Sequence, residues 1–457
     1  MSSPAPVLKR EISLLQATSI NMIDMVGIGP FVVMPLVISM MGSHLFLWAW
    51  IFGAVIAFAD GMIWSELGTK FPLAGGSYNF LKEAYGPKWG RLMSFLFVWQ
   101  TCLQAPLVVA SGAIGFSQYF CYLVPLSEAE RKMVSGAVVL LITFLLYRNI
   151  KTIGKMAVFL WIGVVITIVW IIISGFSHRQ LAYSFLPNGN DQPMFSMAFA
   201  LVLGQASVKT IYSYLGYYNV CHLGGEIRNP GKNIPRSIFI SIFCIAVLYL
   251  LMNISIVSVL PWQEAMKSNF IVSTFMEKIY GHNTAVIATV LVLWIAFASL
   301  FAVVLGYSRV PYAAAADGHF FPAFAKLHPT KAFPYISLLF LGGIGFIFSL
   351  LFKLGDAISA ILAMRIVVQF IAQSVGVVLL RRQPIARKNW FKMWLYPLPV
   401  ILSIWIWLFV FYSTGRLALW GLGLTFCGVL VFYGTRNIWK KPTATAVEAN
   451  TNGDAAH

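Results

Sequence analysis

Apolar stretches long enough to cross a lipid bilayer recur along almost the whole chain. A transmembrane helix needs about 20 consecutive, mostly apolar residues. Of the 457 residues, 59% are hydrophobic and only 10% are charged. Twelve such stretches can be recognised, at about 14–41, 45–65, 92–123, 133–148, 156–176, 194–223, 237–260, 284–307, 335–352, 357–380, 393–413 and 417–434. Soluble domains of ordinary composition do not contain so many long apolar segments. The sequence therefore predicts an all-α integral membrane protein with twelve transmembrane helices.

The chain is strongly basic, with 32 Lys and Arg against 15 Asp and Glu and a net charge of +17. In a soluble protein this excess would suggest binding to nucleic acid. Here most basic residues fall in every second connector, among them Lys82, Lys151, Arg236 and Arg381. This distribution follows the positive-inside rule. We therefore expect both termini in the cytoplasm, a plasma-membrane location (the inner membrane of a bacterium), contacts with anionic lipid headgroups and no nucleic-acid partner.

The residues that usually carry metal or redox chemistry are scattered. The five Cys and seven His show no spacing typical of a disulfide framework or a metal site. A membrane enzyme would need an intramembrane nucleophile or a cluster of His residues, and the sequence contains no such pattern. We expect no catalytic residues, no metal and no cofactor.

Two of the apolar stretches are interrupted near their middles. The first contains Val26-Gly27-Ile28-Gly29-Pro30, and the sixth contains Tyr214-Leu215-Gly216-Tyr217. An unpaired backbone group in lipid is costly, so a helix opens there only to line a cavity or to bind something. Interrupted helices at corresponding positions of two half-sequences indicate the binding site of a secondary transporter.

The interruptions stand five stretches apart, which indicates an internal repeat. Five is an odd number, so the second set of helices would run inverted relative to the first. We expect repeats at about 12–177 and 193–382, extra helices over 393–434, and one transporter domain over 1–441. The segment 442–457 is rich in Ala, Thr and Asn, a composition that predicts a disordered cytoplasmic tail.

Two connectors carry distinctive motifs. The second stretch is followed by Phe71-Pro72-Leu73-Ala74-Gly75-Gly76-Ser77-Tyr78, and the sixth leads into Glu226-Ile227-Arg228-Asn229-Pro230. Together with the glycine-rich first break, they resemble the amino acid–polyamine–organocation superfamily of permeases over about residues 12–385. Tyr212-Ser213-Tyr214-Leu215-Gly216-Tyr217 looks closest to the L-type amino acid transporter branch. The resemblance implies a five-plus-five inverted repeat with helices 1 and 6 unwound, and amino acid transport by alternating access.

The first break exposes backbone amides at the start of a half-helix, and Pro30 suits the first turn because its missing N–H costs nothing there. A helix N-terminus favours an anion, and the resemblance places the substrate carboxylate on the amides of Ile28 and Gly29. Carbonyls at both breaks would accept hydrogen bonds from the substrate ammonium. The expected substrate-binding residues are Met25, Val26, Gly27, Ile28, Gly29, Tyr212, Ser213, Leu215 and Gly216. The alternative is that the breaks are kinks used only for helix packing.

Two pocket residues are candidates for gating or coupling. The resemblance gives Tyr212 the position of an aromatic gate above the substrate; alternatively, its ring only packs. Asp24 lies just before the first break, where a charge must face a cavity or a partner. Asp24 can hold the substrate ammonium, carry a proton or form a structural ion pair.

Arg365 and Glu226 are the remaining gating candidates. Arg365 lies 16 residues before Arg381, or about 24 Å of helix, which places it in the outer part of its span. That depth suits an outer gate, with a structural ion pair or snorkelling as alternatives. Glu226 and Glu66 lie at cytoplasmic helix ends, where we expect them to pair with Lys or Arg in an inner gate.

Two differences from the pattern of the resembling superfamily bear on how transport is coupled to an ion gradient. Many members of the resembling superfamily carry a lysine in the fifth helix, where this chain has Val164. Spans 1 and 8 show no cluster of oxygen-bearing side chains near the site beyond Ser308. We expect exchange or facilitated transport, with Asp24 as the candidate proton carrier, because nothing in the sequence connects Asp60 to a break. A polyamine or organic-amine permease and a non-transporting receptor remain as alternatives, and the substrate and oligomeric state stay open.

Overall fold

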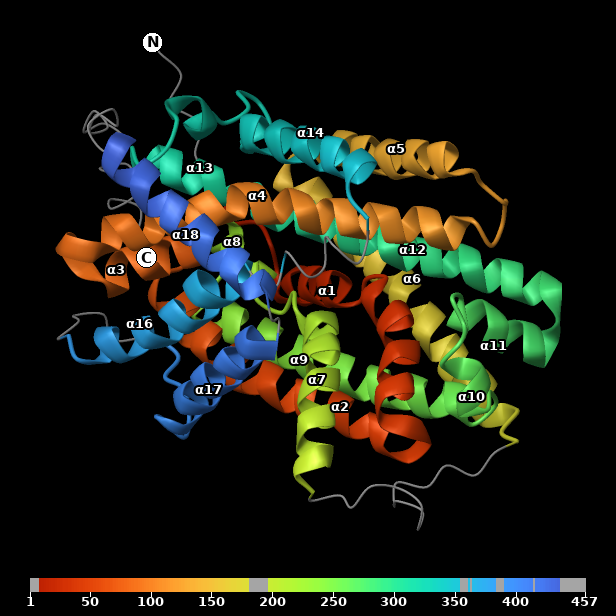
Figure 1. Cartoon of the computed structure of the whole chain (residues 1–457). Helices are drawn as coiled ribbons and strands as arrows, with labels where there is room; N and C mark the ends of the chain where they lie inside the picture. Colours follow the sequence, from red (N-terminus) through yellow and green to blue (C-terminus); the bar gives the residue numbers. More distant parts are fainter. Residues whose placement is uncertain are drawn as a thin grey trace.

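The computed structural model describes residues 8–180, 196–353, 361, 364–383, 390–413 and 416–435. Within these ranges the chain forms a bundle of helices with no β-sheet (Figure 1). The part of the chain expected to form the first repeat contains the helices α1 (Leu14–Met25), α2 (Gly29–Lys70), α3 (Ser77–Ala84), α4 (Gly86–Phe120), α5 (Glu128–Leu146) and α6 (Ile150–Ser177). The expected cytoplasmic tail over 442–457 lies outside the described residues.

The second half of the chain continues the bundle through shorter and longer helices. Its elements begin with α7 (Met197–Tyr214), α8 (Asn219–His222), η1 (Gly224–Glu226), α9 (Pro230–Val257), α10 (Trp262–Ala265), α11 (Ile271–Tyr280) and α12 (His282–Tyr307). They continue with α13 (Arg309–Ala316), η2 (Pro322–Ala325), α14 (Tyr335–Leu351), the π-helical turn η3 (Ile366–Ile371), α16 (Ala372–Arg381), α17 (Leu398–Ser413) and α18 (Arg416–Thr435).

Several helices are long and apolar enough to span a membrane. In the described residues there are five such helices, or six if α1 and the first part of α2, bent by 45° at their break, count as one span. Four further apolar helices are shorter, at Tyr335–Leu351, Ile366–Arg381, Leu398–Tyr412 and Leu419–Gly434. The expected all-α membrane protein is confirmed, whereas the number of twelve spans stays a prediction.

Local sequence signals set the helix ends. Ser13 and Gln16 form a capping box at the start of α1, and Ser127 and Glu130 form one at the start of α5. Such boxes satisfy two of the first-turn amides that lack an intrahelical partner. The second box begins α5 at Glu128, five residues before the start expected from hydropathy, because a polar first turn can extend beyond the apolar stretch.

The boundary expected between the first two apolar stretches lies within α2. This element consists of two helices that meet at a kink, where Gly42 is non-helical with φ 76°. A positive φ is easily adopted by glycine, so the chain turns at Gly42 without a loop.

The short helix α1 lies in the middle of the bundle (Figure 1). It packs against α6, α8, α9 and α12, while α2 packs along α7 and α9. At the periphery, α5 and α14 lie side by side against α4. The two broken helices therefore meet in the bundle interior.

Candidate functional site

The two helix breaks touch each other. The first separates Met25, the last residue of α1, from Gly29, and the second separates Tyr214, the last residue of α7, from Asn219. At the second break Gly216 has φ 124°, and a Cβ added there would lie 2.8 Å from the Met25 amide nitrogen. A side chain at Gly216 would thus force the breaks apart. Both interruptions fall where the sequence predicts them.

Tyr249 of α9 joins the two helix ends. Its hydroxyl lies 2.9 Å from the Met25 carbonyl oxygen and 3.1 Å from the Ser213 carbonyl oxygen. The single hydroxyl hydrogen of Tyr249 is donated to one of these carbonyls at a time, and each carbonyl oxygen keeps a lone pair for another donor. The expectation that they accept from a substrate ammonium stays a prediction. The carbonyls of Val26 and Leu215 accept none of the hydrogen bonds found in the described chain. These two carbonyls are acceptors at the breaks that no donor of the described chain occupies.

The start of α2 presents amides toward the second break. Ile28, its N-cap residue, has no side-chain hydrogen bond to the first turn, and Pro30 lies in that turn as expected. A Cβ added at Gly29 would lie 3.4 Å from the Tyr212 ring and 3.6 Å from Ser213 Oγ. Ser213 Oγ is buried with no hydrogen-bond partner in the described chain. A buried polar atom of this kind calls for an explanation, and a bound ligand would provide one.

A cavity of about 70 Å³ lies between the breaks. The expected residues Asp24, Met25, Gly27, Ile28, Gly29, Tyr212, Ser213, Leu215, Gly216 and Arg365 line it; Val26 and Glu226 do not. The wall is completed by residues that the sequence did not single out: Val108, Ser111 and Gly112 of α4, Tyr218, and Ser299, Leu300, Val303 and Tyr307 of α12. Tyr218 lies within the second break itself, whereas the others come from distant parts of the chain and carry no local signal.

Asp24 faces the cavity and has neutral partners. Its carboxylate Oδ2 accepts a hydrogen bond of 2.7 Å from Asn219 Nδ2, and its backbone carbonyl accepts one of 3.3 Å from Ser299 Oγ. Ser299 lies in the eighth expected span and adds one oxygen-bearing side chain near the site to Ser308. Asp24 has no ion-pair partner among the described residues.

Arg365 also faces the cavity. Its guanidinium donates to the hydroxyls of Tyr218 and Tyr307, and its Nε donates to Gln369 Oε1 at 3.1 Å. Tyr218 immediately precedes α8 and Tyr307 ends α12, so Arg365 lies toward the α8 side of the second break. These contacts do not fit the expected position in the outer part of its span. The residue is only 3% exposed and forms no ion pair in the described chain.

Asp60 of α2 is connected to the second break, contrary to expectation. Tyr217, within that break, donates a hydrogen bond to Asp60 Oδ2. Trp64 Nε1 donates to the same oxygen at 2.9 Å, and Ser403 Oγ of α17 donates to Oδ1 at 3.1 Å. This buried carboxyl therefore couples α2, the second break and α17.

The glutamates expected to form ion pairs do so. Glu226 receives two hydrogen bonds from Arg309, at 2.9 and 3.0 Å, and both side chains are at most 2% exposed. Glu66 receives two from Arg381, at 2.6 and 2.8 Å. A bidentate pair of this kind fixes the helices that carry its two members.

Comparison with known proteins identifies the family. The family described as "Amino acid permease" matches residues 12–435. The chain belongs to this amino acid permease family. The permease is 26% identical over 441 residues to the "Serine/threonine exchanger SteT" of Bacillus subtilis, covering 94% of this chain and 97% of that protein.

Mammalian proteins are also similar to this chain. The permease is 27% identical over 350 residues to the mouse "Asc-type amino acid transporter 1", covering 74% of this chain and 64% of that protein. It is 28% identical over 345 residues to the human "Large neutral amino acids transporter small subunit 2", covering 73% and 63%. The expected superfamily and the expected class, amino acid transporters, are thereby confirmed.

Proposed function

We propose that this permease carries a small, neutral amino acid across the plasma membrane by alternating access, exchanging it for an internal substrate. The observation that supports this most is the cavity between the two breaks, where one helix begins with open amides and carbonyls of both breaks lie nearby. Helix starts attract anions and helix ends attract cations. A zwitterion satisfies both at once, with its carboxylate at Ile28 and Gly29 and its ammonium at Val26 and Leu215.

The charges of the cavity favour a neutral side chain on the substrate. Its lining contains one carboxylate, Asp24, and one guanidinium, Arg365. These opposite charges balance, so the cavity has no net charge to offset a charged substrate. A polyamine would need additional carboxylates to replace its water shell. The same family fold could host such a substrate, but these residues do not favour one.

The shape of the cavity favours a short side chain. Its volume is about 70 Å³, and Val108, Leu300 and Val303 contribute an apolar wall beside Ser111 and Ser299. Small substrates with methyl or hydroxyl groups fit such a wall. The names of the similar exchangers and transporters agree with amino acids as the substrate class.

Three groups would open and close the path. Tyr212, which lines the cavity, would act as the aromatic gate. Arg365 would hold Tyr218 and Tyr307 in the closed state and release them when the α8 side opens. The buried pair of Glu226 and Arg309 would anchor the inner gate.

Exchange is proposed because the permease lacks the features of ion coupling. Val164, at the place of the lysine found in many relatives, is buried in α6 and cannot supply a charge. Asp24 remains the first candidate to carry a proton. The cytoplasmic position of both termini and contacts with membrane lipids belong to the same proposal; the oligomeric state is left open.

The test is uptake of radiolabelled amino acids into proteoliposomes of the purified permease. Serine, threonine and alanine inside the vesicles should each drive uptake of labelled substrate, whereas internal polyamine should not. Amino acid esters, which lack the carboxylate, should compete poorly. Binding without accumulation would instead indicate a receptor. Uptake that depends on an imposed sodium or proton gradient, without internal substrate, would overturn exchange.

A further inference from the structure

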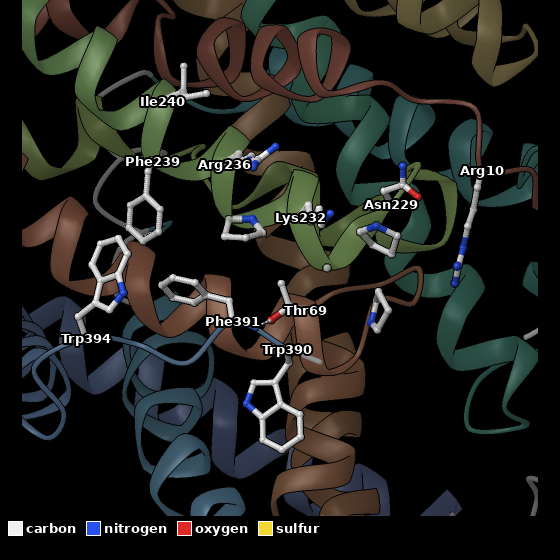
Figure 2. A pocket seen from close by; sticks show the side chains of 14 residues that line it. Arg10, Thr69, Asn229, Lys232, Arg236, Phe239, Ile240, Trp390, Phe391 and Trp394 are labelled. Carbon is white, nitrogen blue, oxygen red and sulfur yellow. Dashed lines mark hydrogen bonds between the residues drawn. The ribbon is translucent and has the colours of Figure 1, made fainter. Parts of the chain in front are cut away.

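A second, larger cavity lies at the start of α9, away from the helix breaks. It has a volume of about 950 Å³ and is lined by residues of the N-terminal segment, α2, α9 and the segment before α17. Figure 2 shows its two-sided character: Phe239, Phe391 and Trp394 gather at one end, and Arg10 and Asn229 lie at the other. We propose that this cavity binds an anionic phospholipid.

Three basic side chains, Arg10, Lys232 and Arg236, lie along the cavity (Figure 2), and its described lining contains no acidic side chain. None of the three takes part in an ion pair within the described chain. Arg10 is held there by its neighbour Ile12, whose amide donates to the Glu226 carbonyl at 2.9 Å. The backbone two residues after Arg10 is thus fixed to the end of η1.

The first turn of α9 also contributes to the cavity. Asn229 and Gly231 line the cavity, and the N-cap residue Asn229 makes no side-chain hydrogen bond to the helix. The helix that starts here is 28 residues long. A phosphate group is the anion that such a helix start and flanking Lys and Arg side chains bind most readily.

The aromatic end has the composition of a membrane interface. The rings of Phe239 and Trp394 are stacked at 5.5 Å, and Phe391 meets Trp394 edge-on at 5.4 Å. Trp394 is 60% exposed. Tryptophan is enriched at the level of lipid headgroups because one part of its ring is apolar and the other polar. This end suits the glycerol and upper acyl region of a lipid.

An apolar stripe continues from the cavity along α9. Ile240, Phe243, Val247 and Leu251 are 42%, 61%, 38% and 37% exposed. Their spacing of three and four residues puts them on the same helix face as Arg236. A molecule with its phosphate at Arg236 and its acyl chain along this stripe would cover both. This continuity is the reason for choosing a phospholipid over a free phosphate ion.

The experiment is native mass spectrometry of the full-length permease released from detergent with phosphatidylglycerol or phosphatidylcholine of identical acyl chains. Phosphatidylglycerol should bind preferentially to the wild-type protein. The variant Lys232→Ala/Arg236→Ala should weaken its binding about 25-fold, from about fivefold per basic residue near a membrane surface. Lys151→Ala/Lys155→Ala is the matched control, because these exposed lysines have the same spacing in the first turns of α6. The control should retain wild-type binding.

Further arms separate the sources of phosphate and guard against misfolding. Phe243→Ser should weaken binding of long-chain phosphatidylglycerol but not of a short-chain form, and excess inorganic phosphate should not displace the lipid. If the double variant elutes as aggregate, Lys232→Gln replaces it, with an expected loss of about fivefold. Equal binding of the two lipids, an equal loss in the Lys151/Lys155 control, or displacement by inorganic phosphate would each overturn the proposal. No substrate is involved, so failure here leaves the proposed transport untouched.

Discussion

The buried charges of Glu226 and Arg309 and those at the cavity are satisfied by different kinds of partner. Glu226 and Arg309 neutralise each other through two hydrogen bonds, both close to 3 Å long. Arg365 and Asp24 instead have hydroxyl and amide partners, and neither has an oppositely charged group within ion-pair distance in the described chain. In the first arrangement each charge is neutralised by its partner. In the second arrangement each charge can still interact with a bound substrate.

This difference separates residues that hold the fold from residues that can act on a substrate. A bidentate pair uses up the hydrogen-bonding directions of both groups, so little is left for a ligand. A charge among neutral partners keeps its field, although burying it is costly, and such residues inside a membrane usually have a functional reason. Five experiments can break or sharpen this contrast.

The largest effect is expected at the buried ion pair of Glu226 and Arg309. Arg309→Ala leaves Glu226 buried without its partner, and breaking such a pair costs about 3–5 kcal/mol. Typical folding free energies are about 5–15 kcal/mol, so the variant should be expressed poorly and unfold early. The measurement is the unfolding temperature in detergent. The double variant Glu226→Gln/Arg309→Gln removes both charges and should recover part of the loss. An Arg309→Ala protein as stable as wild type would show that the pair is dispensable.

At the cavity, a change of size should abolish binding without unfolding the protein. Leucine at position 29 would place its Cβ against Tyr212 and fill a cavity of only about 70 Å³. Substrate binding to Gly29→Leu should become undetectable while the unfolding temperature changes little. Gly343→Leu is the control, because a Cβ at Gly343 of α14 meets nothing within 4 Å. Retained affinity in Gly29→Leu would exclude the proposed carboxylate position.

Removing the guanidinium of Arg365, which has no ion-pair partner in the described chain, should alter the rate of exchange more than the affinity for substrate. Arg365→Gln loses the contacts to Tyr218 and Tyr307, so it shifts the balance between conformations. Exchange in proteoliposomes should slow by about tenfold, the effect of about 1.4 kcal/mol, with equilibrium binding within about threefold of wild type. If binding falls as much as exchange does, Arg365 contacts the substrate itself; unchanged exchange would make it structural.

The two buried carboxyls can be told apart by their response to a pH gradient. Asp24 faces the cavity, whereas Asp60 lies behind the second break with three donors. If any uptake is driven by protons, Asp24→Asn should abolish the driven part and leave exchange within about threefold of wild type. Asp60→Asn should leave the driven part in place. Proton-driven accumulation that survives Asp24→Asn but not Asp60→Asn would transfer the role to Asp60.

Features that depend on local chemistry could be predicted from the sequence. Gly29, Pro30 and Gly216 indicate the two helix breaks. A glutamate at the end of an apolar helix usually pairs with a basic side chain, so an ion pair could be predicted for Glu226. Which arginine it meets could not be predicted, because Arg309 lies 83 residues away. The same limit applies to Tyr249, whose hydroxyl contacts the Met25 carbonyl although the two residues are 224 positions apart.

The sequence also could not predict how deep a residue lies in the bundle or which neighbour its side chain faces. A count of residues along an ideal helix put Arg365 too far out, since contacts with Tyr218 and Tyr307 set its position. Asp60 seemed unconnected because its partner Tyr217 lies 157 residues away along the chain. Hydropathy reports which segments are apolar, but it does not report which side of each helix meets which neighbour.

The smallest effect is expected outside the membrane-spanning helices, where a third group of charges combines ionic and neutral partners. His319 Nδ1 lies 2.8 Å from the Tyr78 hydroxyl, which donates to Asp317, and Lys82 pairs with Asp317 at 2.5 Å. Burial lowers the pKa of His319, with Asp317 opposing this and Arg91 and Lys82 reinforcing it. The unfolded chain therefore binds a proton before the folded protein does, so stability is full above about pH 6.5 and declines as the pH falls below it. His319→Gln should remove this component and flatten the unfolding temperature between pH 7.5 and 5.5 by about 1 °C. A variant with the same pH slope as wild type would show that other groups set the acid sensitivity.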